Sequence, residues 1–187
     1  MDVQAFAKIS PCNYADVITR DRVMDPAIRP LWNPMPRIAG PAYPVACPAG
    51  DNLMLHVAIH RAPAGSVIVC AAGDSNWAMA GGNVCAFAQQ RGIAGFVVDG
   101  CIRDIAETRN NRFPVFGRGL IPIPGVRKTA GLINVPVVCG GVTVARATSS
   151  SPTKRGSWCC RRRRPRRSSA TRKRAPPRTP RPRSRSG

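Results

Sequence analysis

The chain has 187 residues, of which 29 are basic and 9 acidic, giving a formal net charge of +20. The charge is uneven, since positions 145–187 hold 16 basic residues and no acid, whereas positions 1–144 hold 13 basic and 9 acidic residues and carry only +4. A polyanion partner is therefore indicated for the tail only, while positions 1–144 are a mildly basic stretch with the length of one domain with one core.

Six cysteines lie in positions 1–144, mostly in apolar stretches and without Cys-x-x-Cys spacing. This pattern predicts buried free thiols in a reducing compartment rather than disulfides or a zinc site. The first residues lack the basic and apolar regions of a signal peptide, and no apolar run reaches the roughly 18 residues of a membrane span. We therefore expect a cytoplasmic protein with no membrane partner.

The first elements expected along the chain are short. Amphipathic helices are predicted at 5–10 and 14–21, and a proline-rich stretch up to Pro48 is expected to be extended and irregular. The sequence "GDNLMLHVAIHRAPAG" at 50–65 predicts a helix with Asp51 as its N-cap.

Strands then alternate with helices. Short buried strands are predicted at 66–73 and 93–100, and the helix between them, at 81–92, is expected to end at Gly92. Another helix should open near Asp104. Further strand-like runs lie at 113–123 and 133–144. This alternation indicates an α/β domain.

The sequence "GFVVDGCIRD" places Arg103 and Asp104 after a strand, at the expected start of a helix. Such positions in α/β domains favour anions, because free backbone N–H groups and the helix dipole both attract negative charge. Arg103 can grip a carboxylate through two hydrogen bonds, and Asp104 can hold a magnesium ion, which takes only one or two protein carboxylates. The alternative is that Asp104 only caps its helix and Arg103 is a solvated neighbour.

Other candidate sites carry weaker signals. His56 and His60 lie four residues apart, as a metal-binding pair could, but no third ligand is evident and the surroundings are apolar, which favours a packed helix. The glycines of "AGGNVCAFAQQRG" match neither a dinucleotide-binding nor a phosphate-binding loop.

The blocks "AMAGGNVCAFAQQRGIAGFVVDGCIRDIAETRNNRFPVFGRGLIPIPGV" and "NVPVVCGGVTV" together resemble the RraA-like family in order and spacing, from about Cys47 to Val144. That family contains 4-hydroxy-4-methyl-2-oxoglutarate aldolases, 4-carboxy-4-hydroxy-2-oxoadipate aldolases and regulators of ribonuclease E activity. The resemblance implies a swivelling β/β/α fold for positions 1–144, assembled as a homotrimer with the active site between subunits.

The resemblance also implies roles for individual residues. Arg103 would bind the substrate carboxylate and Asp104 a magnesium or manganese ion. The backbone amides of the turn would hold the other end of a 2-oxo acid. The implied activity is that of a divalent-metal-dependent lyase that cleaves 4-hydroxy-2-oxo acids to pyruvate, with oxaloacetate decarboxylation as a second implied reaction. The residues of the turn are Gly81, Gly82, Asn83 and Val84.

One departure from the family pattern bears on activity. Family aldolases usually carry an acid in the glycine turn, to orient a water for proton transfer, and Gly82 stands at that place here. Asp74 is a candidate to approach the same site. Without the acid, the alternative is a non-catalytic regulator that binds an RNA-degrading enzyme.

The family pattern stops at Val144, although members continue with a segment like P-G-D-x-V-x-A-D-x-x-G-V. When the codons for 145–161 are translated one base out of frame, with G or C at the free third bases, they give "PGDVVVADEEGVVVLP". The genetic code alone forces two of these residues, at the Trp158–Cys159 and Cys159–Cys160 junctions. A frameshift near Ala145 therefore competes with a selected arginine-rich arm that binds nucleic acid non-specifically. On either interpretation 145–187 is expected to be disordered. A frameshift would leave the domain incomplete and its activity impaired.

Overall fold

The computed structural model describes residues 8–146 of the chain. The tail beyond Arg146, with its predicted disorder and basic charge, and most of the helix expected at 5–10 lie outside these residues. The described part is a mixed α/β structure, which confirms the predicted class.

A five-stranded sheet forms the centre, in the order β1–β6–β4–β3–β2. Its parallel strands are β2 (Ala42–Ala46), β3 (Val67–Ala71), β4 (Gly95–Asp99) and β6 (Val115–Gly117), and β1 (Arg29–Pro30) pairs antiparallel with β6. The parallel strands are apolar on both faces, as a sheet covered on both sides requires.

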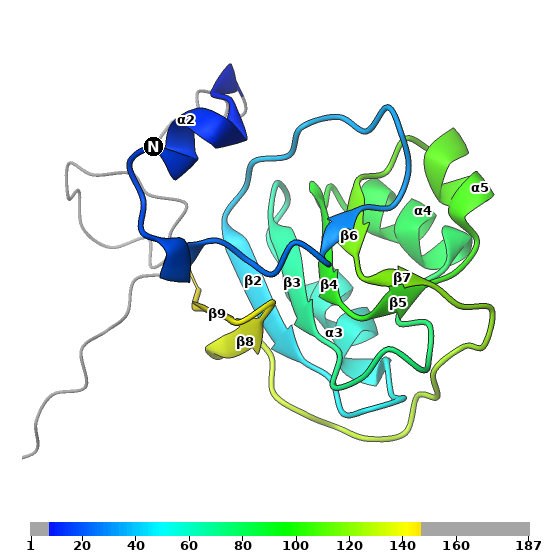
Figure 1. The fold of residues 1–187 in the computed structure, drawn as a ribbon. Helices are drawn as coiled ribbons and strands as arrows, with labels where there is room; N and C mark the ends of the chain where they lie inside the picture. The colour runs from blue at the N-terminus through cyan, green and yellow to red at the C-terminus, as the bar shows by residue number, and fades with distance from the viewer. Residues whose placement is uncertain (1–7, 147–187) are drawn as a thin grey trace, which may run out of the picture.

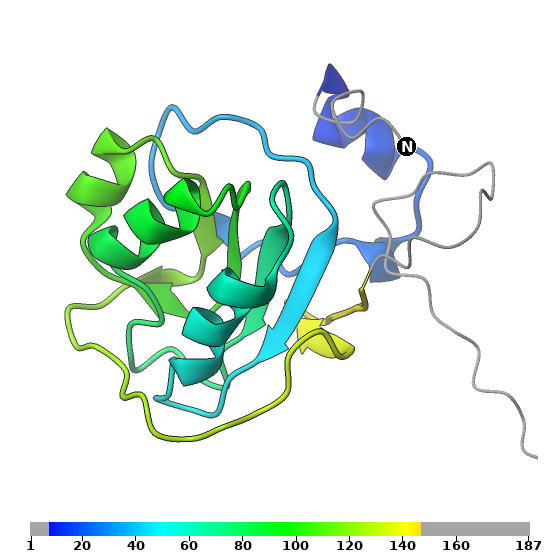
Figure 2. The same ribbon diagram turned by 180° about the vertical axis from the view of Figure 1, so that it is seen from behind.

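Helices cover one face of the sheet. Figure 2 shows α3 (Leu53–Arg61) and α4 (Gly82–Gln90) against the strands, with α5 (Ile105–Asn110) beside α4. Side chains from alternate strand positions, such as Ile68 and Phe96, pack here against the helices in the larger apolar core.

A hairpin covers part of the opposite face. It consists of β8 (Val137–Cys139) and β9 (Val142–Val144), and Figure 1 shows it on the side of β2 and β3 away from α3. Its apolar side chains pack on Val67 and Val69, which point away from the helices. The two buried faces explain why β3 is apolar at every position.

Short elements complete the fold. The segment between β4 and β6 contributes β5, which pairs in parallel with the strand that follows β6. Within residues 8–146, no helix combines the length and apolar character that crossing a membrane requires. The remaining short elements are α2 (Pro11–Ala15), the 3-10 helix Arg20–Arg22, β5 (Cys101–Ile102) and β7 (Gly119–Leu120).

Two predictions near the N-terminus need correction. The helix expected at 14–21 is absent, since α2 ends at Ala15 and only a 3-10 turn follows. Cys12 is exposed, although the other described cysteines are buried free thiols as predicted. Neither region places a side chain in the apolar cores, so core packing does not extend the weak helical pattern.

The N-cap of α3 is Asn52 rather than the predicted Asp51. The Asp51 carboxylate, only 3% exposed, accepts hydrogen bonds from the backbone N–H groups of Leu53, Lys128 and Thr129. One side chain thus joins the start of α3 to the long connection between β7 and β8. These bonds, the one from Leu53 first, lower the pKa of Asp51, against the opposing effect of burial.

A second carboxylate holds the sheet to the hairpin. Asp99, at the end of β4, accepts from Nε of Arg118 at 2.5 Å and from the backbone N–H of Gly140 at 2.6 Å. Arg118 also donates from Nη1 to Asp25 at 3.0 Å. The bond to Asp99, then that to Asp25, raises the pKa of Arg118. This network joins β4, the hairpin and the N-terminal segment.

We predict that Asp51→Asn makes stability less dependent on pH in acid. Because the folded state lowers the pKa of Asp51, its ionised form stabilises the fold above the ordinary carboxyl pKa of about 3.9, and this contribution is lost as pH falls through the lower folded pKa. Urea midpoints measured between pH 6 and pH 3 should therefore fall more steeply for the wild type than for D51N. Parallel curves for the two proteins would contradict this role of Asp51.

Asp99→Asn should destabilise the fold by about 2 kcal/mol, because charge-assisted hydrogen bonds to Arg118 and Gly140 are lost or weakened. Urea denaturation at neutral pH measures the change. Asp16→Asn, the same substitution at an exposed residue of the N-terminal segment, is the control and should change stability by no more than about 0.5 kcal/mol. Equal effects of the two substitutions would show that the Asp99 network adds nothing.

Candidate functional site

The backbone brings the glycine turn to the strand-end motif. The backbone N–H of Met79 donates to the carbonyl of Cys101 at 2.9 Å, and that of Arg103 donates to the carbonyl of Ala80, also at 2.9 Å. These bonds align the segment before α4 with the segment before α5. Gly81 and Gly82 therefore lie next to Asp104, as the resemblance implied.

Asp104 occupies the N-cap position of α5 in the left-handed backbone conformation, with φ 55° and ψ 50°. A non-glycine residue pays for this conformation with about 1–2 kcal/mol, and Asp is among the few that adopt it. Its side chain makes no capping bond to α5. Instead, Oδ2 accepts from the backbone N–H of Gly82 at 3.3 Å and lies 3.5 Å from Nε of Arg103. The simple capping alternative is therefore wrong for the Asp104 side chain.

The lack of side chains at the turn is a steric requirement. A Cβ on Gly81 would collide with Oδ2 of Asp104 and crowd the Arg103 side chain. A Cβ on Gly82 would lie 2.6 Å from Cβ of Glu107. The two glycines therefore let the N-terminus of α4 approach the start of α5 closely.

The Arg103 and Asp104 side chains are accessible, at 42% and 43% exposure. An ion pair this exposed contributes at most about 1 kcal/mol to stability. Oδ1 of Asp104 and the two terminal nitrogens of Arg103 have no hydrogen-bond partner among residues 8–146. The pair thus presents an open acceptor and an open two-nitrogen donor to solvent.

Asn83 and Val84 form the first turn of α4. Backbone N–H groups in a first turn have no acceptor within their helix, so they can donate to an anion. Asn83 is exposed, whereas Val84 packs partly against the core. Of the four turn residues named from the sequence, Gly81 and Gly82 are thus buried against the start of α5, and Asn83 is the exposed one.

Asp74 lies in a different hollow. It lines a space of about 290 Å³ with Asp99, Arg118 and Val138, and its carboxylate accepts from the backbone N–H of Asn76. It makes no hydrogen bond or ion pair with Arg103 or Asp104. Nothing in its contacts supports the suggestion that Asp74 reaches the same site.

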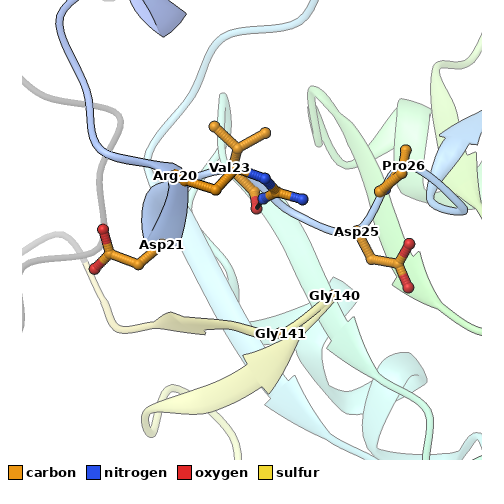
Figure 3. Close-up of a pocket in the computed structure, with 7 residues that line it drawn as sticks. All are labelled: Arg20, Asp21, Val23, Asp25, Pro26, Gly140 and Gly141. Atoms are coloured by element: carbon orange, nitrogen blue, oxygen red, sulfur yellow. Dashed lines mark hydrogen bonds between the residues drawn. The ribbon is translucent and has the colours of Figure 1, made fainter.

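A larger hollow of about 460 Å³ lies between the N-terminal segment and the hairpin, as Figure 3 shows. Asp25 and Gly140 line it, both members of the Asp99 network, and Arg20 covers one side. Neither hollow contains Arg103, Asp104 or the glycine turn. The strand-end pair lies open to solvent, with side chains 42% and 43% exposed.

His56 packs as the apolar alternative predicts, whereas His60 is exposed. The His60 ring lies 5.0 Å from that of Phe87, and His56 is half-buried, with burial first, then Arg127 and His60, lowering its pKa. Among residues 8–146, no group of three or more His, Cys, Asp or Glu side chains is placed to hold a metal. A metal at Asp104 would therefore keep mostly water ligands.

Glu107 was not among the site residues predicted from the sequence. It lies in the first turn of α5, three residues after Asp104, and its side chain passes over Gly82. The available signal was that Glu107 lies only three residues after Asp104, close to the same helix start.

Comparison with known proteins identifies the family of the chain. The Aldolase/RraA model of the RraA-like family matches residues 11–148. A protein of Halalkalibacterium halodurans named "Putative 4-hydroxy-4-methyl-2-oxoglutarate aldolase" is 45% identical over 118 residues, or 63% of this chain and 56% of that protein. The chain thus spans little more than half the length of that relative. A protein of the same name from Burkholderia multivorans is 37% identical over 125 residues, covering 66% of this chain and 75% of that one.

The solved structure described as the RNA-processing inhibitor RraA from Thermus thermophilis has a TM-score of 0.66 and 23% identity, covering 74% of this chain and 84% of that one. At this identity the likeness shows the fold, which is that of the implied β/β/α type. Since the family match includes the sheet, the helices, the hairpin and the strand-end residues, the chain belongs to the RraA-like family.

Proposed function

We propose that the chain is a divalent-metal-dependent lyase that cleaves 4-hydroxy-2-oxo acids to pyruvate by retro-aldol chemistry. The observation that carries the proposal is the open Arg103–Asp104 pair beside the glycine N-terminus of α4. Two relatives are named "Putative 4-hydroxy-4-methyl-2-oxoglutarate aldolase", which supports this substrate class. Oxaloacetate decarboxylation, which also yields pyruvate, fits the same site.

Arg103 is suited to the substrate carboxylate. Its Nε faces Asp104, while its two terminal nitrogens remain open, and a guanidinium binds a carboxylate through two parallel hydrogen bonds. The N–H groups of Asn83 and Val84 can donate hydrogen bonds to the opposite, anionic end of the substrate at the positive end of α4. The 2-oxo acid would thus be held between two segments that the backbone bonds at Ala80 fix together.

Asp104 is the residue that fits a metal. Magnesium and manganese favour oxygen ligands, magnesium is often held by one or two carboxylates, and Oδ1 of Asp104 is open. Gly81 supports this fit, because a side chain there would fill the space against the carboxylate. When bound, such an ion polarises a carbonyl oxygen and stabilises the charge that develops on it.

The proposed chemistry needs no Schiff-base lysine, and no lysine of residues 8–146 forms a hydrogen bond or ion pair with Arg103 or Asp104. The only lysines of positions 1–144 are Lys8 and Lys128. The backbone of Lys128 is held by Asp51 on the connection that follows β7, remote in its contacts from Arg103. Charge stabilisation at the site therefore falls to Arg103, to the α4 amides and to a bound cation.

A homotrimer with the site at a subunit boundary is part of the proposal. Exposed apolar side chains of Trp77, Leu120 and Ile123 support it, with exposures of 38%, 52% and 50%. They lie on segments hydrogen-bonded to β5 and to each other, next to the strand-end site. Apolar side chains gathered on adjoining segments are typical of a protein interface.

The second candidate function is a regulator that binds an RNA-degrading enzyme without catalysis. The absence of an acid at Gly82 favours it, and the fold of the RraA structure from Thermus thermophilis is compatible with it. A catalyst needs Arg103 and Asp104 for turnover, whereas a regulator has no turnover that depends on them. Variants of these two residues therefore distinguish the two functions.

We predict that Asp104→Asn lowers pyruvate release by about 100-fold or more, because the charge that holds the cation is lost. Arg103→Lys should instead raise KM by about tenfold, since lysine keeps the charge but loses the paired hydrogen bonds. Pyruvate release from 4-hydroxy-4-methyl-2-oxoglutarate, with and without magnesium, measures both. Turnover that is absent in the wild type, or unchanged by D104N, would favour the regulator.

The chain as it stands should turn over more slowly than a version with the reading frame restored at Ala145. Restoring the frame supplies "PGDVVVADEEGVVVLP", a strand-rich segment, in place of an arginine-rich one. A magnesium-dependent pyruvate assay on both chains, with the oligomeric state of each from sedimentation, tests this. Equal turnover and equal oligomeric state would contradict the frameshift interpretation.

A further inference from the structure

A second carboxylate lies at the proposed site and has no assigned role. Glu107 is exposed on the first turn of α5, and its carboxylate makes no hydrogen bond or ion pair with any residue of the described part. It follows Asp104 by three residues, and the side chains of both residues approach Gly82.

Glu107 occupies the space in which a side chain of residue 82 would begin. A Cβ on Gly82 would lie 2.6 Å from Cβ of Glu107, 3.2 Å from its Cγ and 3.4 Å from Cβ of Asp104. No real pair of Cβ atoms tolerates the first distance. A carboxylate over the turn can therefore come from residue 82 or from residue 107, but not from both without a shift of the helices.

The start of α5 is firmly placed against α4. Thr108 is fully buried and donates from both its backbone N–H and Oγ1 to the carbonyl of Asp104, at 3.2 and 3.0 Å. Its hydroxyl also meets the buried thiol of Cys85 on α4. The Glu107 stem is thus fixed between Asp104 and the α4 N-terminus, although its carboxylate is in solvent.

The local charges favour a cation between the two carboxylates. Asp104 and Glu107 would repel each other at this spacing, and Arg103 already faces Oδ2 of Asp104. The positive end of α4 offsets part of the repulsion. A hydrated divalent ion would offset the rest, with its waters reaching the longer side chain.

We propose, resting on the proposed function, that Glu107 is a positioning residue that holds a water of the site and thereby does the work of an acid at residue 82. As the bond between C3 and C4 of the substrate breaks, its electron pair passes into the 2-oxo group to form the pyruvate enolate. The water held by Glu107 takes the proton released from the 4-hydroxyl group. A proton is then returned to C3, so the products are pyruvate and a carbonyl compound.

The test is manganese binding to the full chain, followed by electron paramagnetic resonance with and without oxalate as a pyruvate analogue. Glu107→Gln should weaken manganese binding by about tenfold, as loss of an outer carboxylate does. Asp16→Asn, an exposed charge far along the chain from the site, is the matched control and should bind as the wild type does. Unchanged manganese affinity in E107Q overturns the proposal.

Relocating the carboxylate separates positioning from a merely structural role. G82E alone should lose binding, because its Cβ meets that of Glu107. E107G removes the obstacle and should also bind weakly. The double variant G82E/E107G should recover manganese affinity to within about threefold of the wild type, because the carboxylate is restored over the turn.

The outcomes distinguish this inference from the proposed function. Loss of manganese binding in D104N but not in E107Q would leave the metal site standing and overturn the role of Glu107 alone. A double variant that binds no better than E107G would also overturn it. A wild-type chain that binds no manganese, with or without oxalate, would overturn both. Circular dichroism of each variant confirms that the fold is retained.

Discussion

The close approach of two helix starts, made possible by the missing side chains at Gly81 and Gly82, is the constraint on which the site depends. A Cβ at either position would strike the Asp104 carboxylate or the Glu107 stem. With glycine there, the Gly82 amide can donate to Asp104, and the Arg103 guanidinium lies against the same oxygen. The sheet contributes by fixing the segments that carry these residues, through the backbone bonds at Ala80 and Cys101.

The rest of the fold relies on two buried or half-buried carboxylates that bind backbone groups. Asp51 joins α3 to the connection after β7, and Asp99 joins β4 to the hairpin through Gly140 and Arg118. Both act across long sequence separations, where the chain has no regular pairing. Asp51 and Asp99 are therefore used to hold irregular segments. Among residues 8–146, the carboxylates of Asp104 and Glu107 lie at the proposed site.

Much of the fold followed from local pattern. The strand at 66–73, the helix ending at Gly92, the strand to Asp99 and the helix after Asp104 were all predictable, because apolar runs and glycine stops act within a few residues. The sequence also put Arg103 and Asp104 at a strand end. The sequence did not predict the bounds of the short N-terminal helix α2 or the role of Asp51. Both depend on whether contacts form with residues far along the chain. The side-chain direction of Asp104 was equally unpredictable, because a left-handed backbone turns it from its own helix to another.

That left-handed conformation also limits what evolution can place at residue 104. Glycine and asparagine adopt the same backbone angles readily, whereas β-branched and bulky residues do so at greater cost. In a relative that has lost catalysis, residue 104 should therefore be asparagine or glycine, because both keep the backbone turn and neither carries the negative charge. Of aspartate, asparagine and glycine, the three residues that this backbone conformation accepts readily, only aspartate carries a carboxylate. Aspartate at residue 104 therefore satisfies both the backbone and the proposed chemistry.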